Sequence, residues 1–130
     1  EGNVQTLARR RGEVVILDFW YRGCGPCIQA MPELKRLATR FSGRPVAVFG
    51  MNTDEDAEDA RFVAKAMDLN YPTLLVSETD LARSYGASQF GFPTLVIIDQ
   101  EGVIRWIHTG YAPDISERIS EVVEPLLGEK

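Results

Sequence analysis

The sequence predicts an α/β fold, in which a mixed sheet of about five strands carries helices on both faces. Short apolar runs alternate with stretches of helical periodicity, and two apolar runs near the end are joined by a short glycine-containing turn. The chain has 130 residues, of which 45% are hydrophobic and 25% are charged, as in an ordinary globular domain. We therefore expect one domain over residues 1–130.

The first expected strand is Glu13–Trp20, a β-branched and aromatic run that is too apolar for a half-solvated strand. It predicts a central strand that is buried on both faces. Apolar residues then recur at helical spacing from Cys27 to Phe41, and Ser42-Gly43 marks the end of this helix. Pro32 lies inside the pattern, but the apolar stripe continues past it, so we expect the helix to continue as well.

The same alternation is then repeated. The run Pro45–Met51 predicts a second buried strand, and Asp54 is expected to open a helix with an apolar inward face. Residues Pro72–Val76 predict a short third strand, followed by a short helix that ends near Gly86.

The last two expected strands run antiparallel to each other, unlike the strands before them. Pro93–Asp99 and Val103–Ile107 flank a three-residue turn, so they predict an antiparallel hairpin. An amphipathic helix is expected to begin near Pro113-Asp114 and to continue to Leu127. The sheet should therefore be parallel at first and antiparallel at its end.

The motif Cys24-Gly25-Pro26-Cys27 follows the first strand and opens the first helix. A helix start carries unpaired backbone N–H groups and about half a positive charge, so it favours a thiolate and lowers the pKa of Cys24. Cys27 lies one turn further on the same helical face, which makes a disulfide with Cys24 feasible. We expect Cys24 to be the accessible nucleophile and Cys27 to be the partly buried resolving thiol, which needs a base.

Asp18 is the candidate for that base. It stands in the middle of an otherwise apolar strand, where an ionised carboxylate is costly, so its pKa should lie above the usual range. A raised pKa suits proton exchange with Cys27, by way of a water molecule. The alternative is that Asp18 is a satisfied core acid with no role in chemistry.

These residues together resemble a known family. Asp18-Phe19-Trp20, then Cys24-Gly25-Pro26-Cys27 and then Pro32 resemble the thioredoxin signature, and Pro93-Thr94 is similar to the cis-proline of that superfamily. The extra strand and helix over about residues 72 to 86 and the run from Gly91 to Gly102 resemble the TlpA/ResA-like branch of extracytoplasmic thiol-disulfide oxidoreductases. The resemblance implies a thioredoxin-like fold.

The resemblance also implies roles for single residues. Cys24 would be the nucleophile, Cys27 the resolving thiol and Asp18 the buried proton acceptor. Pro93 would pack in the cis form beside the two sulfurs. Substrate would be bound by the backbone of Phe92, through strand addition, and by residues around the disulfide. The residues in this second set are Trp20, Gly25 and Pro26.

The chain departs from the family pattern at three places. The residue before Cys24 is usually Trp, and here Gly23 stands there with Tyr21-Arg22 ahead of it, which removes an aromatic contact surface. The second strand has no Lys to accompany the buried acid, so Asp18 should titrate higher than is usual. The dipeptide between the cysteines resembles that of reducing thioredoxins, although many TlpA-like proteins carry a different pair.

The resulting prediction is an enzyme that reduces protein disulfides, receives electrons from an upstream dithiol donor, and needs no dissociable cofactor and no metal. A zinc site would require four ligands, and the chain has two cysteines and one histidine, His108. The alternatives are a redox-inactive or weakly active thioredoxin-fold binding module, and a disulfide isomerase or oxidase. A thiol peroxidase is disfavoured because no separate peroxidatic Cys motif is present.

Charge and hydropathy narrow the expected partners and location. A net charge of −5 has the wrong sign for a nucleic-acid-binding protein, and no apolar run has the roughly 18 to 20 residues of a membrane span. The sequence starts without Met or a signal-like segment, as a mature form or an excised segment would, so an anchor could have been removed. We expect an extracytoplasmic or periplasmic monomer, with a cytoplasmic location as the alternative.

Overall fold

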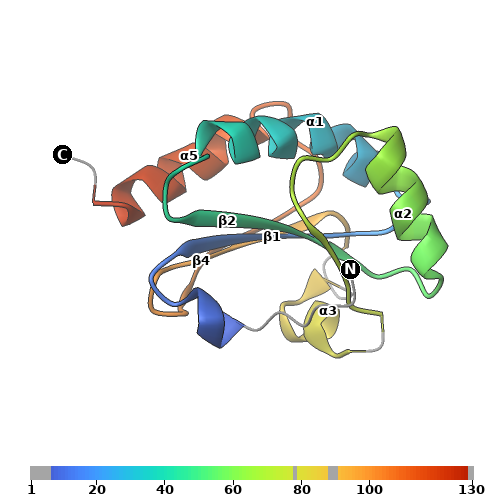
Figure 1. The fold of residues 1–130 in the computed structure, drawn as a ribbon, viewed down its shortest axis with the longest axis horizontal. Helices are drawn as coiled ribbons and strands as arrows, with labels where there is room; N and C mark the ends of the chain where they lie inside the picture. The colour runs from blue at the N-terminus through green and yellow to red at the C-terminus, as the bar shows by residue number, and fades with distance from the viewer. Residues whose placement is uncertain (1–6, 78, 88–90, 129–130) are drawn as a thin grey trace.

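The computed structural model describes residues 7–77, 79–87 and 91–128. Its centre is a sheet of five strands in the order β3-β2-β1-β4-β5 (Figure 1). The strands are β1 (Val14–Trp20), β2 (Val46–Asn52), β3 (Thr73–Leu75), β4 (Thr94–Ile98) and β5 (Ile104–Thr109). The helices are η1 (Leu7–Arg10), α1 (Gly25–Arg40), α2 (Ala57–Ala66), α3 (Leu81–Ser84) and α5 (Ile115–Leu126).

The strand pairing confirms the predicted mixed sheet. β1 is parallel to β2, and β2 is parallel to β3, while β4 is antiparallel to both β1 and β5. All seven residues of β1 are buried, as expected of a central strand that is covered on both faces. This strand carries Asp18 and leads directly to the Cys24–Cys27 motif.

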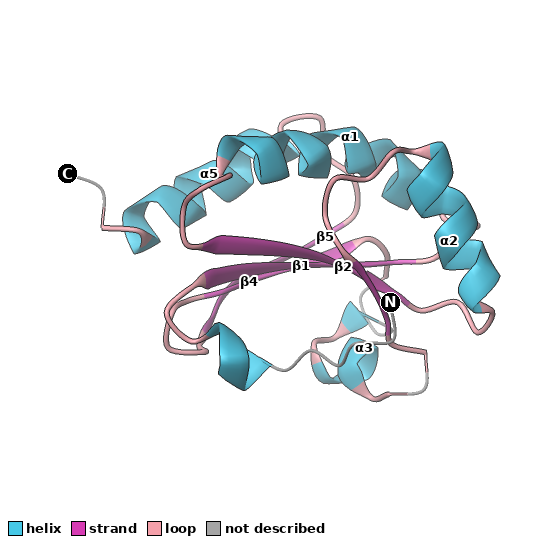
Figure 2. Ribbon diagram, in the orientation of Figure 1, coloured by secondary structure: helices cyan, strands magenta, loops and turns pink. Residues whose placement is uncertain are grey.

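Helices cover both faces of the sheet. Figure 2 shows α1, α2 and α5 on one side of the sheet and α3 on the other. The first side encloses a core in which Ile16 and Leu95 of the sheet meet Leu34 of α1 and Ile119 of α5. The opposite side encloses a second apolar core that contains Phe19. Side chains alternate along β1, so Asp18 and Trp20 share the α1 face with Ile16.

The second helix begins later than the sequence pattern suggested. Asp54 was expected to open it, but α2 starts at Ala57 and its N-cap is Asp56, whose side chain accepts a hydrogen bond from the N–H of Glu58. The carboxylate of Asp54 is used elsewhere, because it accepts hydrogen bonds from the N–H of Arg22 and from the side chain of Asn52. The helix start therefore lies two residues later than expected, because Asp54 is engaged in these contacts.

The other expected elements are present with small differences at their ends. Pro32 lies inside α1, which continues to Arg40 as its apolar stripe predicted. The third strand is limited to Thr73–Leu75 at the edge of the sheet. Within the described residues, no helix is both long enough and apolar enough to cross a membrane.

Candidate active site

The two cysteines lie where β1 ends and α1 begins. Cys24 is the N-cap of α1, with extended backbone angles, and its Sγ accepts a hydrogen bond of 3.2 Å from the N–H of Cys27. The Cα atoms of the two residues are 5.2 Å apart and their sulfurs are joined as a disulfide. Pro26 occupies the first turn, where no hydrogen bond is lost by the missing N–H. Since the first amides of the helix point at Cys24, a thiolate at this position is stabilised after reduction.

The two cysteines differ less in exposure than we expected. Cys27 is fully buried, whereas 4% of the surface of Cys24 is exposed. The prediction that Cys24 is the more exposed of the two cysteines is therefore correct, but Cys24 is not openly accessible in the disulfide form. It packs in one cluster with Cys27, Met31 and Trp20, which leaves only a small part of the residue for contact with another molecule.

Asp18 lies within β1 and is completely buried. Neither of its carboxylate oxygens has a hydrogen-bond partner among the described side chains and backbone groups. Desolvation by burial raises the pKa of Asp18 from 3.8 to about 8. Its strand neighbours are Gly50 on β2 and Leu95 on β4, which bring no charge to it. No described protein group therefore satisfies the carboxyl group of Asp18, unlike a core acid that is held by hydrogen bonds from the protein.

The peptide bond between Phe92 and Pro93 is cis, as the resemblance implied. Pro93 is buried and its carbonyl accepts a hydrogen bond from the N–H of Gly110, which follows β5. Phe92 is partly buried and packs against the cluster that contains both cysteines. The β1–α1 loop and the loop before β4, far apart in sequence, thus meet at the disulfide.

The three other residues that we expected to bind substrate are placed differently. Gly25 and Pro26 are exposed beside the disulfide, which leaves them available for contact. Trp20 is fully buried in the cluster below the cysteines. Because no part of its ring reaches the surface, the interpretation of Trp20 as a substrate contact does not fit, and its position makes it a support for the disulfide.

The loop before Cys24 supplies an aromatic surface that the sequence comparison missed. A Cβ atom at Gly23 would lie 3.8 Å from the ring of Tyr21, so this ring covers the position of the absent side chain. Tyr21 also makes an edge-to-face contact with Phe92, with the ring centroids 5.2 Å apart, and 39% of its surface is exposed. The sequence did carry a signal for this surface, because Tyr21 stands two positions before Gly23, where the family usually has Trp.

Arg22 attaches the same loop to α2. Its guanidinium group lies 4.0 Å from the ring centroid of Phe62 and donates a hydrogen bond of 3.0 Å to Asp59. Its backbone N–H donates to Asp54 at 2.8 Å. The approach to Cys24 is therefore held between α2 and the loop before β4.

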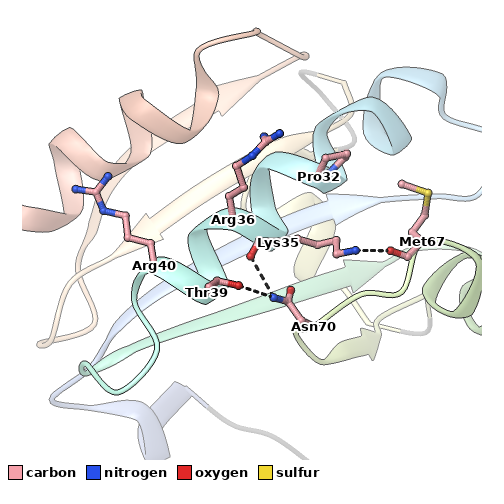
Figure 3. A pocket seen from close by; sticks show the side chains of 7 residues that line it. All are labelled: Pro32, Lys35, Arg36, Thr39, Arg40, Met67 and Asn70. Carbon is pink, nitrogen blue, oxygen red and sulfur yellow. Dashed lines mark hydrogen bonds between the residues drawn. The ribbon is translucent and has the colours of Figure 1, made fainter.

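A groove of about 510 Å³ lies away from the cysteines, between α1 and the turn that follows α2 (Figure 3). Three hydrogen bonds join its walls. The ammonium group of Lys35 donates to the carbonyl of Met67 at 2.9 Å, and the amide of Asn70 donates to the carbonyl of Lys35 and to the hydroxyl of Thr39, both at 3.1 Å. These bonds fix the turn on α1, and the residue that follows them is Tyr71.

Comparison with known proteins agrees with this geometry. The Redoxin family model matches residues 1–123. The chain belongs to the redoxin family. This redoxin is 31% identical over 111 residues to the thioredoxin-like protein YneN of Bacillus subtilis and 28% identical over 110 residues to the thiol-disulfide oxidoreductase ResA of Geobacillus thermodenitrificans. The alignments cover 84% and 85% of this chain, and they span just under two thirds of each relative, 64% and 62%.

A solved structure gives the same result for the fold. A Chlorobium tepidum protein described as the thiol:disulfide interchange protein DsbE superimposes with a TM-score of 0.86 at 28% identity. The match covers 94% of this redoxin and 85% of that chain. This redoxin is therefore a TlpA/ResA-like member of the thioredoxin superfamily, as the motifs indicated.

Proposed function

We propose that this redoxin is a thiol-disulfide oxidoreductase that reduces disulfides in protein substrates. The observation that carries the proposal is the pairing of a Cys24–Cys27 disulfide at a helix N-terminus with the buried, unpartnered carboxyl group of Asp18 on the adjoining strand. The similarity to ResA and to DsbE supports the same activity. The redox group is the cysteine pair itself, so the reaction needs no organic cofactor.

The first step is the attack of the Cys24 thiolate on one sulfur of a substrate disulfide. The substrate S–S bond breaks, a Cys24–substrate mixed disulfide forms, and the other substrate sulfur leaves as a thiolate that takes a proton from water. The helix start favours this step because its amides stabilise the Cys24 thiolate.

The second step resolves the mixed disulfide. Cys27 transfers its thiol proton to the Asp18 carboxylate, and its thiolate attacks the sulfur of Cys24. The Cys24–Cys27 disulfide forms and the second substrate thiol is released, so the two electrons of the dithiol have passed to the substrate. The pKa of Asp18, about 8, lies close to that of a free thiol, and proton exchange between such matched groups is efficient.

Substrate would be seated by the two loops that meet at the disulfide. The backbone of Phe92 pairs with an extended substrate segment, while the exposed ring of Tyr21 and the exposed Gly25-Pro26 form the surface around the attacked sulfur. We further propose that the protein acts outside the cytoplasm as a monomer and is reduced by an upstream dithiol donor.

Reduction of insulin with a dithiol donor tests the activity. The wild type should accelerate precipitation of the insulin chains, and Cys24→Ser should reduce the rate by about a thousandfold or more, because the nucleophile is lost. Cys27→Ser should accumulate a mixed disulfide, visible as a mass increase on Cys24. Wild-type protein that does not exceed the donor alone would leave a binding module as the better assignment.

The reduction potential of the cysteine pair tests the direction. Equilibration in dithiol buffers, with free thiols counted after alkylation, should give one two-electron transition in the reducing range of thioredoxins. A potential in the oxidising range would instead identify an oxidase or isomerase.

A further inference from the structure

A row of paired residues leads from Asp18 to the edge of the sheet. Asp18 pairs with Gly50 on β2, and Gly50 pairs with Thr73 on β3, which is the edge strand. Residues that are paired in register project to the same face of a sheet, so Thr73 lies on the face that carries Asp18. Between them stands a glycine, whose position has no side chain to separate the two.

Two aromatic rings occupy the room above this glycine. A Cβ atom at Gly50 would lie 3.0 Å from Nε1 of Trp20 and 3.3 Å from Cε1 of Tyr71, both closer than ordinary contact. The charge of Asp18 also raises the pKa of Tyr71, after the larger effect of burial, which places the two groups within electrostatic reach of each other. Both rings therefore border the space beside Asp18.

The polar atoms of these rings are buried and lack partners. Nε1 of Trp20, the hydroxyl of Tyr71 and the hydroxyl of Thr73 make no hydrogen bond to any described group, and neither do the two oxygens of Asp18. Each buried polar atom without a hydrogen-bond partner destabilises the fold, so five such atoms in neighbouring positions require partners. Groups arranged in this way are the usual partners of internal water.

The position of Tyr71 is set from outside the core. The bonds from Lys35 to the carbonyl of Met67 and from Asn70 to α1 hold the preceding turn on the outer side of that helix (Figure 3). On the other side, the N–H of Gly50 donates to the carbonyl of Pro72 at 2.9 Å. Tyr71 is therefore fixed between two anchored neighbours, and the residue is only 7% exposed.

We propose that Tyr71 and Thr73 form, over Gly50, a hydrated path that carries the proton between Asp18 and the edge of the sheet, and that Tyr71 is the residue that positions this path. The inference rests on the proposed function, because it concerns the proton that Asp18 takes from Cys27. After resolution, that proton leaves Asp18 through water held by the hydroxyls of Tyr71 and Thr73 and reaches solvent at β3. No charge is created on the tyrosine, since Tyr71 stays neutral and donates to the water of the path, which in turn donates to the carboxylate.

Few other groups can influence Asp18. Tyr71 is the titratable side chain whose electrostatic interaction with Asp18 is resolved, and the strand neighbours Gly50 and Leu95 carry no charge. Cys27 is held in the disulfide of the oxidised protein and does not titrate there. Burial is the cause of the raised pKa of Asp18, and no charged side chain of the described residues shifts it. Removal of the Tyr71 hydroxyl should therefore change the pKa of Asp18 directly.

The test compares Tyr71→Phe with Tyr85→Phe. Tyr85 is a matched control, because it is a partly buried tyrosine whose ring packs on Phe19 at the opposite face of the sheet. Carbon NMR of the Asp18 carboxyl in the oxidised protein should show its pKa rise by about one unit in Tyr71→Phe, since the hydroxyl that holds the water next to the carboxylate is lost. Tyr85→Phe should titrate as the wild type does.

Resolution is measured with the reduced protein and a chromogenic aryl disulfide, which releases one aryl thiolate on attack by Cys24 and a second on resolution by Cys27. At pH 7 the second release should be about tenfold slower in Tyr71→Phe, because a one-unit rise leaves about a tenth of the ionised carboxylate. The effect should vanish in the Asp18→Asn background, whereas a general loss of packing would persist there.

The proposal is overturned if Tyr71→Phe titrates and resolves like Tyr85→Phe, or if its effect persists without Asp18. Should Tyr71→Phe fail to fold, Thr73→Val tests the outer end of the path, with resolution expected to slow by about threefold and an unchanged rate counting against the path. The NMR titration uses the oxidised protein and no turnover. It therefore tests the interaction between the Tyr71 hydroxyl and the Asp18 carboxyl even if the protein does not reduce insulin, that is, even if the proposed function fails.

Discussion

Two buried aspartates, one inside the sheet and one in the turn after β4, show opposite behaviour. Asp18 in β1 is completely buried, has no hydrogen-bond partner among the described groups, and has its pKa raised to about 8 by desolvation. Asp99 follows β4 and is 7% exposed, yet its pKa is lowered, chiefly by the hydrogen bond from the N–H of Val103. Glu101 and Arg105 donate to the same carboxylate.

The difference teaches that hydrogen-bond partners, rather than burial alone, decide the charge of a carboxylate in this protein. Asp99 closes the β4–β5 turn, and each of its oxygens accepts at least one donor at 2.9 to 3.0 Å. It is a structural residue that is most stable when ionised. Asp18 is held where ionisation is costly, which suits a group that must take up and release a proton.

The largest effect is expected from Asp18→Asn. The folded-state pKa of Asp18 is raised above the unfolded value of 3.8, so the folded protein binds more protons between pH 4 and pH 8. Wild-type stability should therefore fall by about 1.4 kcal/mol per pH unit between roughly pH 5 and pH 7. In Asp18→Asn this slope should disappear, and the variant should be more stable than the wild type at pH 8, by up to about 5 kcal/mol.

Denaturant unfolding of the oxidised protein across this pH range measures the effect of Asp18→Asn. Leu17→Ala serves as the control, since Leu17 is the next residue of β1 and is also buried, on the apolar face. It should lose about 2 to 5 kcal/mol and keep the wild-type pH slope. An unchanged slope in Asp18→Asn would show that another group titrates.

A smaller effect is expected from Gly50→Ala, which alters the surroundings of Asp18 without touching its charge. The added Cβ would meet the rings of Trp20 and Tyr71 at 3.0 and 3.3 Å, and such overpacking costs about 1 to 3 kcal/mol. Unfolding experiments at pH 5 should show the loss. Gly23→Ala is the matched control, because its Cβ would meet Tyr21 only at an ordinary 3.8 Å. Equal losses of unfolding free energy in the two variants would contradict the close contact at position 50.

The smallest effect is expected from Asp99→Asn, and its pH dependence has the opposite sign. A lowered folded-state pKa contributes stability above pH 3.8 that is lost as the pH falls through the folded value. The variant should melt at a lower temperature than the wild type at pH 7, and the two melting temperatures should converge as the pH falls through the folded-state pKa of Asp99. Thermal unfolding followed by circular dichroism measures this, and a constant difference at every pH would mean that the charge of Asp99 contributes nothing.

The regularities of the chain were enough to predict most of the fold. The apolar run of β1, the helical stripe of α1 and the glycine-containing turn after β4 each follow from local periodicity and turn chemistry, and each is present as predicted. The start of α2 was misplaced by two residues because Asp54 is used in a tertiary hydrogen bond to Arg22, which no local pattern reveals.

The candidate site was predicted in part. The sequence by itself determined the chemistry, since Cys24 and Cys27 frame the first turn of α1 and Asp18 interrupts an apolar strand. Only the tertiary structure decided that Trp20 is buried below the disulfide and that the ring of Tyr21 covers Gly23.

Tyr71 shows the same division most clearly. Its ring lies in the space above Gly50, next to Asp18, although Tyr71 follows Asp18 by 53 positions in the sequence. Two features place the ring there: β2 and β3 pair in register, and the turn before Tyr71 is hydrogen-bonded to α1. Local periodicity reports which side of an element a residue occupies. It carries no information about which distant residue fills the space that a missing side chain leaves, since that depends on packing between elements.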